Sequence, residues 1–485
     1  MARPRRFPAG LELPPFKSGP MGRPILAAAA PSLATLALDQ GNGIAAQPVV
    51  VVGDRVRVGS LVARSEGDFG VDVHATVAGT VRSLEVRPVP GAAATSPCLV
   101  IENDWTDDRE DASTPLDWQA TTPADLLARI RSAGIAGLGG AAFATHAKLE
   151  AARDAKVSHL VLNGAECEPW ICCDDALMRE RAADVVLGAR VMQRVVDAER
   201  VTIAIEDDKP EAITAVEAAL AATDHHGLAL AVVPAVFPAG AERQLLASVT
   251  GIEVPGDAWP PAVGLLCQNV GTAAAVARVV TSGEPLTRRI VTVTGSAIAA
   301  PANVEARLGT PIADLIEACG GYRGEPLRLI AGGSMTGRAL PSDDAPVTQA
   351  LNCVVVATAA DLAVHGSEMP CIRCGDCASV CPAGLLPQSL LRAVASADAQ
   401  GLVRLGLADC IECGCCDYVC PSRIPLTARF VAARRERRLR LDQERRAARA
   451  RERYAGHERR LAAGAEAERR EFEEARRRAR GDGQS

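Results

Sequence analysis

Short apolar runs alternate with longer amphipathic segments through the middle of the chain. Runs rich in Val, Ile and Leu predict buried strands, and apolar residues that recur every three or four positions predict helices. Strands and helices that alternate in this way predict a largely parallel sheet with helices on both faces. Ligands of such an α/β domain are expected beyond the carboxyl ends of its strands. The predicted strands are 159–163, 200–207 and 227–234, and the predicted helices are 123–135, 180–198, 209–222 and 241–251.

The pattern before this region is different. Residues 1–47 are rich in Pro, Gly and Ala and predict an extended segment that wraps around other parts of the protein. Residues 48–102 carry short β-runs separated by Gly-Asp and Ala-Gly turns, which predict a small β domain. The spacing of its Val, Gly and His residues resembles biotinyl/lipoyl-type barrel-sandwich domains. Those domains carry a modified lysine, but residues 48–102 contain none, so we expect the fold without the swinging-arm chemistry.

The second half of the chain predicts three further units. Residues 288–340 place two β-runs around a helix at 310–321, which is typical of a β-grasp-like (SLBB-type) module, and we expect 341–370 to be a spacer. Residues 365–430 predict a helical domain that contains two cysteine runs. Residues 431–485 hold 18 Arg against 11 acidic residues without sustained apolar heptads. They predict a solvated charged helix or a disordered tail, and the functional alternative is contact with anionic lipid head groups or an acidic partner subunit.

The two cysteine runs carry the strongest chemical motif. Residues 371–387 (CIRCGDCASVCPAGLLP) and 410–426 (CIECGCCDYVCPSRIPL) each contain C-x₂-C-x₂-C-x₃-C-P. Zinc sites use two short pairs split by a longer gap, so zinc and disulfides fit this spacing less well. It resembles two-cluster bacterial ferredoxins, in which three cysteines of one run and the fourth of the other hold each 4Fe-4S cluster. The expected ligand sets are Cys371, Cys374 and Cys377 with Cys420, and Cys410, Cys413 and Cys416 with Cys381.

Composition narrows the classes of function. The 485 residues are enough for about three domains, and 48% of them are hydrophobic. The net charge of −6 does not indicate a nucleic-acid partner. Eight cluster thiols require a reducing compartment. The apolar stretch 24–38 is broken by Pro31 and is shorter than the roughly 20 residues that a membrane helix needs, so we expect a soluble or peripheral protein.

A glycine-rich loop at 137–150 is a candidate ligand site. Gly137, Gly139 and Ala142 formally match G-x-G-x-x-A, but a helix precedes the loop where a dinucleotide-binding fold has a strand. We therefore reject a Rossmann loop. A glycine loop that opens a helix can still seat a phosphate on backbone N–H groups, and Lys148 would add a positive charge there.

Several stretches together resemble one family, the C subunit of the Rnf ion-translocating electron-transport complex. The resemblance covers most of residues 6–435. Residues 123–285 are also similar to the flavoprotein subunit of respiratory complex I, which binds FMN and NADH. The matching stretches are AGIAGLGGAAFATHAKL (133–149), LVLNGAECEPWICCDDALM (160–178), IEDDKPEAI (205–213), FPAGAERQLLASVTGIEVP (237–255), QNVGTAAAV (268–276), RIVTVTG (289–295) and the two cysteine runs.

This resemblance implies a flavin site. The glycines would lie against the flavin phosphate and ribityl chain, the lysine would neutralise the phosphate, and the remaining residues would line the pocket, with Glu168 on the nicotinamide-ribose or adenine side. Ala142 and Ala144 stand where the family usually has Gly and Pro, which narrows the backbone approach to a ligand. The implied residues are Gly137, Gly139, Gly140, Lys148, Asn163, Glu166, Cys167, Glu168, Glu242, Asn269 and Thr272.

The resemblance also implies a function. The chain would be an electron-input subunit that takes electrons from NADH through FMN to two 4Fe-4S clusters, without a catalytic acid or base. Its partners would be integral and peripheral subunits of the complex and, indirectly, ferredoxin, and it would lie peripherally on the cytoplasmic side of the cell inner membrane. Two alternatives remain: an iron–sulfur relay and docking subunit without flavin, and a soluble NADH diaphorase subunit.

Overall fold

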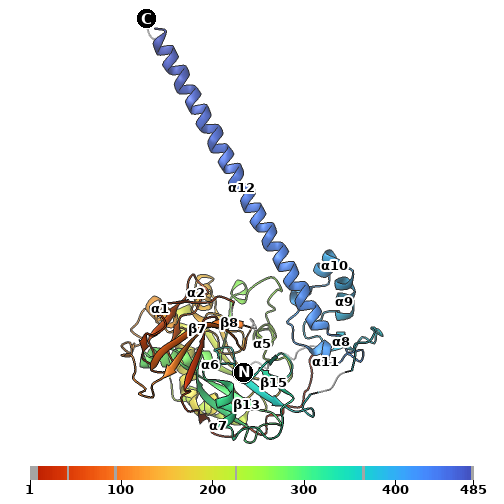
Figure 1. Ribbon diagram of the computed structural model, residues 1–485. Helices are drawn as coiled ribbons and strands as arrows, with labels where there is room; N and C mark the ends of the chain where they lie inside the picture. The colour runs from red at the N-terminus through yellow and green to blue at the C-terminus, as the bar shows by residue number, and fades with distance from the viewer. Residues whose placement is uncertain (1–8, 41–42, 92–94, 224–226, 363–365, 482–485) are drawn as a thin grey trace.

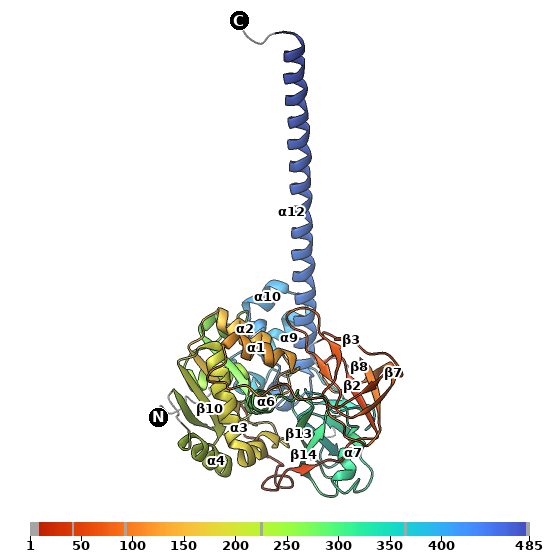
Figure 2. The same cartoon turned by 90° about the vertical axis from the view of Figure 1, so that its left-hand side faces the viewer.

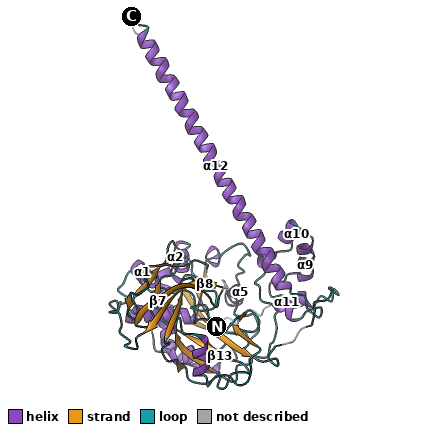
Figure 3. Ribbon diagram, viewed as in Figure 1, coloured by secondary structure: helices purple, strands orange, loops and turns teal. Residues whose placement is uncertain are grey.

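The computed structural model of the chain describes residues 9–40, 43–91, 95–223, 227–362 and 366–481 (Figure 1). Parts of the segments predicted above, at 1–8, 41–42, 92–94, 224–226, 363–365 and 482–485, lie outside the described residues. The strands gather in a broad body, whereas the C-terminal part is helical and sends one long helix away from it (Figures 2 and 3). The multidomain α/β class predicted from the sequence is therefore confirmed.

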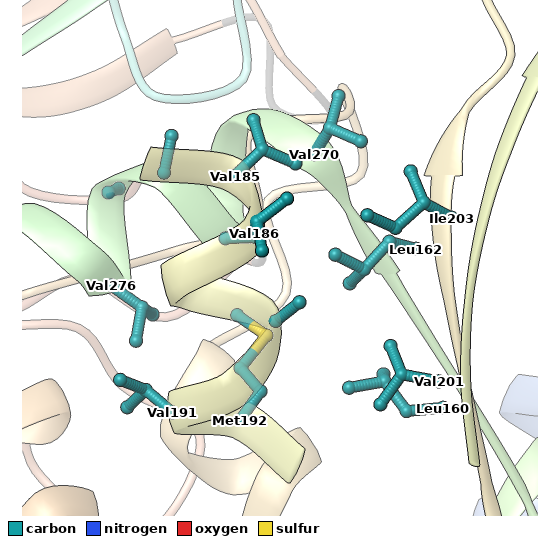
Figure 4. Close-up of a cluster of buried hydrophobic side chains, with 14 of the residues drawn as sticks. Leu160, Leu162, Val185, Val186, Val191, Met192, Val201, Ile203, Val270 and Val276 are labelled. Carbon is teal, nitrogen blue, oxygen red and sulfur yellow. The ribbon is translucent and has the colours of Figure 1, made fainter. Parts of the chain in front are cut away.

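The central domain is built on a four-stranded parallel sheet in the order β11-β10-β9-β12. Helices α3, α4 and α6 pack on one face, and α5 packs on the other. In Figure 4, side chains of β9 and β10 point toward Val186 and Met192 of α3. Burial of each such side chain contributes about 1.5–3 kcal/mol. The elements are α1 (Pro123–Ser132), α2 (Thr145–Asp154), β9 (His159–Gly164), α3 (Cys173–Val196), β10 (Arg200–Glu206), α4 (Pro210–Ala221), β11 (Leu228–Val233), α5 (Glu242–Thr250), β12 (Leu265–Asn269) and α6 (Val270–Ser282).

Helix α3 begins seven residues before its predicted start at residue 180, so that prediction was wrong. The backbone at Arg181 is not helical (φ −134°) and divides α3 into two parts. The apolar periodicity from which the helix was predicted belongs to the second part. The first part is held at its N-terminus by a carboxylate, because Glu166 accepts hydrogen bonds from the backbone N–H groups of Asp174 (2.9 Å) and Asp175 (2.8 Å).

The N-terminal β domain consists of two small sheets, β2-β8-β7-β4 and β3-β5-β6. Strand β2 lies inside the segment 1–47 and pairs with β8, so that segment is not only an extended wrap. The preceding residues do cross the central domain, where Leu11 pairs with Phe237. The strands are β2 (Leu33–Ala37), β3 (Gln47–Pro48), β4 (Arg55–Val56), β5 (Leu61–Arg64), β6 (Val73–His74), β7 (Gly79–Pro88) and β8 (Thr95–Asn103).

The third sheet has the order β1-β14-β13-β17-β15-β16. Strand β17 lies at residues 353–357 between β13 and β15 and is buried along its whole length, so the prediction of a spacer over 341–370 was wrong. The run CVVVA is short and stands alone between polar stretches, which is why its strand character was overlooked. The elements are β1 (Leu26–Ala27), β13 (Arg288–Thr294), β14 (Ala302–Arg307), α7 (Ile312–Ala318), β15 (Arg328–Ala331), β16 (Arg338–Leu340) and β17 (Cys353–Ala357).

The C-terminal part is a small helical domain followed by the 54-residue helix α12, which is about 81 Å long at 1.5 Å per residue. Leu426 and Phe430 at the start of α12 are buried in the helical domain, and the helix then runs into solvent (Figure 1). Among the described residues, no helix is long and apolar enough to cross a membrane. The helices are α8 (Asp376–Ser379), α9 (Pro387–Ala395), α10 (Ala399–Arg404), α11 (Cys415–Tyr418) and α12 (Leu426–Ala479).

Candidate flavin site and iron–sulfur centres

Two asparagines mark the carboxyl edge of the central sheet. Asn163 is the residue before the last in β9 and is paired in register with Asn269 at the end of β12. The Asn163 side chain donates to Gly240 O (2.8 Å) and accepts from Ala165 N (3.0 Å), which shapes the loop that follows β9. Asn269 caps α6 by accepting from Gly271 N (2.8 Å). The sheet therefore brings these two predicted site residues together.

The glycine loop lies against the same edge. Leu138 N donates to Thr272 Oγ1 (2.9 Å), and a Cβ placed on Gly139 would lie 3.1 Å from Cβ of Asn269. Gly140 has φ +99°, a conformation that favours glycine, and a Cβ there would have only Asn352 within 4 Å. Ala142 is fully buried with φ +47°, so alanine occupies a left-handed position that favours glycine.

The start of α2 is buried, and the backbone N–H of its first residue, Thr145, donates to Ile135 O (3.0 Å). No side chain caps this helix, and the buried Thr145 Oγ1 at its first residue has no hydrogen-bond partner among the described residues. Free N–H groups at a helix N-terminus favour a phosphate. The glycine loop, the uncapped helix and this orphaned hydroxyl together fit the phosphate end of a flavin nucleotide.

Lys148 and Glu242, both predicted for the site, form an ion pair of 2.5 Å. Burial disfavours the charged lysine, but the neighbouring carboxylate outweighs this and raises the pKa of Lys148. The lysine that was predicted to neutralise a phosphate therefore already forms an ion pair with Glu242, the first residue of α5.

The loop after β9 carries the other three predicted residues. Glu166 is buried and holds the N-terminus of α3, so its carboxylate performs a structural task. Cys167 Sγ accepts from Gly240 N (3.1 Å). The Glu168 carboxylate accepts from the N–H groups of Met335 (2.8 Å) and Thr336 (2.7 Å), in the loop after β15. The structure therefore uses Glu168 to join the central domain to the β-grasp-like module.

Two further charged groups lie at this loop. The buried Lys17 comes from the N-terminal segment, and its ammonium donates to Glu166 O. Glu206, at the end of β10, is fully buried, and its oxygens have no hydrogen-bond partner among the described residues, although Lys209 Nζ lies 3.5 Å away. Burial raises the pKa of Glu206 to about 7, against the charges of Lys17 and Lys209. A lone lysine 149 residues away in the sequence gave no signal by which it could have been found.

Asp174 is a further buried acid that was not predicted. Its Oδ2 accepts from Asn269 Nδ2 (2.6 Å). Burial, and then the neighbouring Glu166, raises the pKa of Asp174 to about 8. Asp174 is the second residue of α3 and lies before the predicted start of that helix, so the sequence did not indicate its position.

The cysteine domain is an internal repeat with an offset of 39 residues. Gly375 (φ +91°) and Gly414 (φ +79°) precede the short helices α8 and α11 at equivalent positions. The fourth cysteine of each run accepts from the backbone N–H four residues later, with Leu385 N 3.4 Å from Cys381 Sγ and Ile424 N 3.5 Å from Cys420 Sγ. The two C-x₂-C-x₂-C-x₃-C-P segments therefore fold alike.

A small cavity in this domain fits one of the expected ligand sets. It is lined by Cys410, Cys413 and Cys416 of the second run and by Cys381 of the first. The cavity is also lined by Cys415 and Thr427 and by Leu, Ile, Pro, Phe, Ala and Gly residues. The convergence of the four expected thiols in this mainly apolar setting is suited to a cubane cluster. Cys371 and Cys374 of the other expected set are exposed. None of the cysteines forms a disulfide in the part of the chain that the structure describes.

Comparison with family models divides the chain in the same order as the structure. The RnfC barrel sandwich hybrid domain matches residues 5–106, and the Nuo51 FMN-binding domain matches 130–278. The SLBB domain matches 290–339, and the 4Fe-4S dicluster domain matches 370–424. The matched domains support FMN and iron–sulfur clusters as the cofactors.

Curated relatives extend this match over most of the chain. The C subunit of the ion-translocating oxidoreductase complex of Pseudomonas aeruginosa is 44% identical over 385 residues, 79% of this chain. The corresponding C subunit of Haemophilus influenzae strain 86-028NP is 39% identical over 426 residues, 87% of this chain. Over most of its length the chain is thus similar to curated proteins named as this C subunit. The chain spans only 49% and 64% of the lengths of these two relatives.

Among solved structures, this chain is similar to an NAD⁺-reducing [NiFe]-hydrogenase in the H₂-reduced state, with 19% identity and a TM-score of 0.46. The likeness covers 66% of this chain and 63% of that chain. It is too weak to bear on function.

Proposed function

We propose that this chain is the electron-input subunit of a membrane-bound Rnf-type complex, which couples electron transfer between NADH and ferredoxin to ion translocation. The proposal assigns NADH as the electron donor, FMN and two 4Fe-4S clusters as cofactors, and other subunits of the complex as acceptors. It places the chain peripherally on the cytoplasmic side of the inner membrane. Bound FMN supplies the change from two-electron to one-electron chemistry.

One observation carries the proposal: a flavin-type domain and a two-cluster domain occur in one chain and touch each other. Arg243 of α5 lies 3.9 Å from Asp409, directly before Cys410, and Glu242 beside it belongs to the candidate flavin site. A chain with both cofactor domains in contact needs no diffusing carrier between them.

The work of the protein's own residues is to bind and to orient. The loop 137–144 and the uncapped start of α2 hold the phosphate end of the flavin, and Lys148 supplies positive charge. Asn163, Cys167, Asn269 and Thr272 shape the pocket from the strand ends. No proton-transferring side chain is required for hydride transfer. The eight cluster cysteines act as thiolate ligands in the two crossed sets.

The test uses the full chain reconstituted with iron, sulfide and FMN. We expect an absorbance band near about 450 nm from bound flavin, which NADH bleaches, and iron–sulfur signals that appear in the electron paramagnetic resonance (EPR) spectrum. Gly140→Val, which places a branched side chain at φ +99°, should abolish flavin binding and leave the iron content unchanged. A chain that keeps its clusters but binds no flavin would be a relay subunit, and the enzyme proposal would fail. Ala142 is the feature that makes this outcome worth testing.

A further inference from the structure

The two cysteine runs are alike in fold but differ in what covers them. Cys371 and Cys374 are exposed, whereas the equivalent Cys410 and Cys413 are partly covered. Ile372, between the first two cysteines of its run, is 68% exposed. Its equivalent Ile411 lines a groove of about 730 Å³ between α5 and the cluster domain. The same residue type at the same repeat position is therefore exposed in one run and lines a groove bordered by the central domain in the other.

The second run makes the contacts to the flavin-type domain. A Cβ placed on Gly256, after α5, would lie 2.2 Å from Asp409 Oδ1, and Asp409 directly precedes Cys410. The groove is also lined by Pro382 and Ala383, which follow Cys381. Cys381 belongs to the first run but is expected to be the fourth ligand of the second-run cluster. The groove therefore borders that one cluster site on two sides.

A second path reaches the same site through the β-grasp-like module. Glu168, in the loop of the candidate flavin site, accepts from Met335 N at 2.8 Å. A Cβ placed on Gly414 would lie 3.3 Å from Met335 O. Gly414 is bonded to Cys413. A continuous chain of short contacts thus leads from the candidate flavin loop to a ligand of the second-run site.

The first run presents a small apolar surface to solvent. Met369 is 48% exposed and Ile372 is 68% exposed, beside the exposed Cys371 and Cys374. A cluster held by these thiols would lie just below the protein surface. Exposed apolar side chains beside a redox centre suit brief docking of another redox protein, because they bury area without a network of ion pairs.

We propose that electrons enter the cluster domain at the second-run site (Cys410, Cys413, Cys416, Cys381) and leave from the first-run site (Cys371, Cys374, Cys377, Cys420). The segment 369–374, which we term the exit loop, docks a partner protein that carries a one-electron centre. Each transfer moves one electron: the donor is oxidised by one, the receiving site is reduced by one, and no bond forms or breaks. Electron tunnelling slows steeply with distance, which favours the covered site as the first acceptor. This inference rests on the function proposed above.

The order of the sites is tested with the full chain reconstituted with FMN, iron and sulfide. NADH is mixed with Cys374→Ser or Cys413→Ser, and samples are frozen at millisecond intervals for EPR spectroscopy. In C374S we expect the second-run site to be reduced at the wild-type rate. In C413S we expect reduction of the first-run site to slow more than tenfold. Reduction of that site at the wild-type rate in C413S would overturn the order. If NADH reduces neither site in the wild-type protein, the proposed function itself fails.

The exit loop is tested without removing any ligand. Ile372→Glu is compared with Val403→Glu, which alters a residue of α10 that is 56% exposed. The readout is reduction of cytochrome c, a one-electron acceptor protein, by NADH-reduced full chain. We expect I372E to slow cytochrome c reduction at least fivefold, with cluster reduction by NADH and ferricyanide reduction unchanged, and V403E to behave as wild type. If I372E reduces cytochrome c as fast as the wild type does, or if I372E and V403E are slowed equally, the exit loop is not the docking site.

Discussion

The two halves of the cluster domain share a backbone but not an environment. Arg373 and Glu412 both have φ +59°, and the pairs Gly375/Gly414 and Gly384/Arg423 repeat the left-handed conformation at equivalent positions. Local sequence therefore determines the loop that wraps a cluster. What covers each loop is determined by distant residues: Met335 and Gly256 approach the second run at Gly414 and Asp409, while Cys371 and Cys374 stay exposed. The duplicated motif thus has two different environments, as the proposed relay requires.

The largest expected effect tests whether the two runs exchange their fourth cysteine. If Cys420 completes the first-run site, Cys371→Ser with Cys420→Ser disables one cluster, and iron falls from about eight atoms to about four. Cys381→Ser with Cys420→Ser disables both and lowers iron to near zero. The measurement is iron per chain after anaerobic purification. Similar iron in the two double variants would mean that each run holds its own cluster.

The next effect concerns the shared core under both runs. Phe430 is 1% exposed in the apolar cluster that contacts Cys377, Cys410, Cys416 and Cys420. We expect Phe430→Ala to cost about 3–5 kcal/mol of domain stability, because it leaves a cavity. Urea titration followed by loss of the cluster absorbance gives the midpoint. Phe472→Ala, on the same helix but 69% exposed, should leave that midpoint unchanged; equal shifts would contradict the packing argument.

Features encoded by neighbouring residues could be predicted from the sequence. The C-x₂-C-x₂-C-x₃-C-P runs, the strands β9 and β10 and the glycine loop depend on spacing, periodicity and residue type within about 20 positions. The cavity formed by Cys381 with Cys410, Cys413 and Cys416 follows from the same spacing.

Features made by distant partners could not be predicted. Lys17 reaches Glu166 across 149 residues, and Glu168 reaches Met335 across 167. Nothing beside either residue in the sequence signals the contact. Strand β17 depends on its place between β13 and β15, which the run CVVVA alone cannot reveal. The candidate site was therefore predicted as a set of residues, while the ion pairs and hydrogen bonds that hold its side chains were not.

A smaller effect would distinguish the electronic environments of the runs. Thr427 Oγ1 lies 3.7 Å from Cys416 Sγ, and Gln388 at the equivalent position lies 3.5 Å from Cys377 Sγ. Donors to ligand sulfurs stabilise the reduced cluster, so Thr427→Val should lower the reduction potential of the second-run cluster by some tens of millivolts. Gln388 presents its Oε1 to Cys377 as an acceptor, so Gln388→Leu removes no donor and should not lower the potential of the first-run cluster. Redox titration followed by EPR resolves the two, and a shift of both potentials in either variant would argue against local control.

The smallest effect concerns Arg434 of α12, which forms hydrogen bonds to the second cysteine run. Arg434 Nη1 donates to Cys410 O (2.5 Å) and to Glu412 Oε1 (2.7 Å), while the equivalent position in the first repeat is Ala395. The ion pair is partly exposed, so its contribution is about 0.2–1 kcal/mol. Arg434→Ala should therefore raise the rate at which a chelator removes the second-run cluster by about twofold to fivefold, and leave the first-run rate unchanged. Arg435→Ala, one position along α12, is the matched control. If R434A changes neither rate, the different cover of the two runs comes from the central domain alone, and α12 has no part in it.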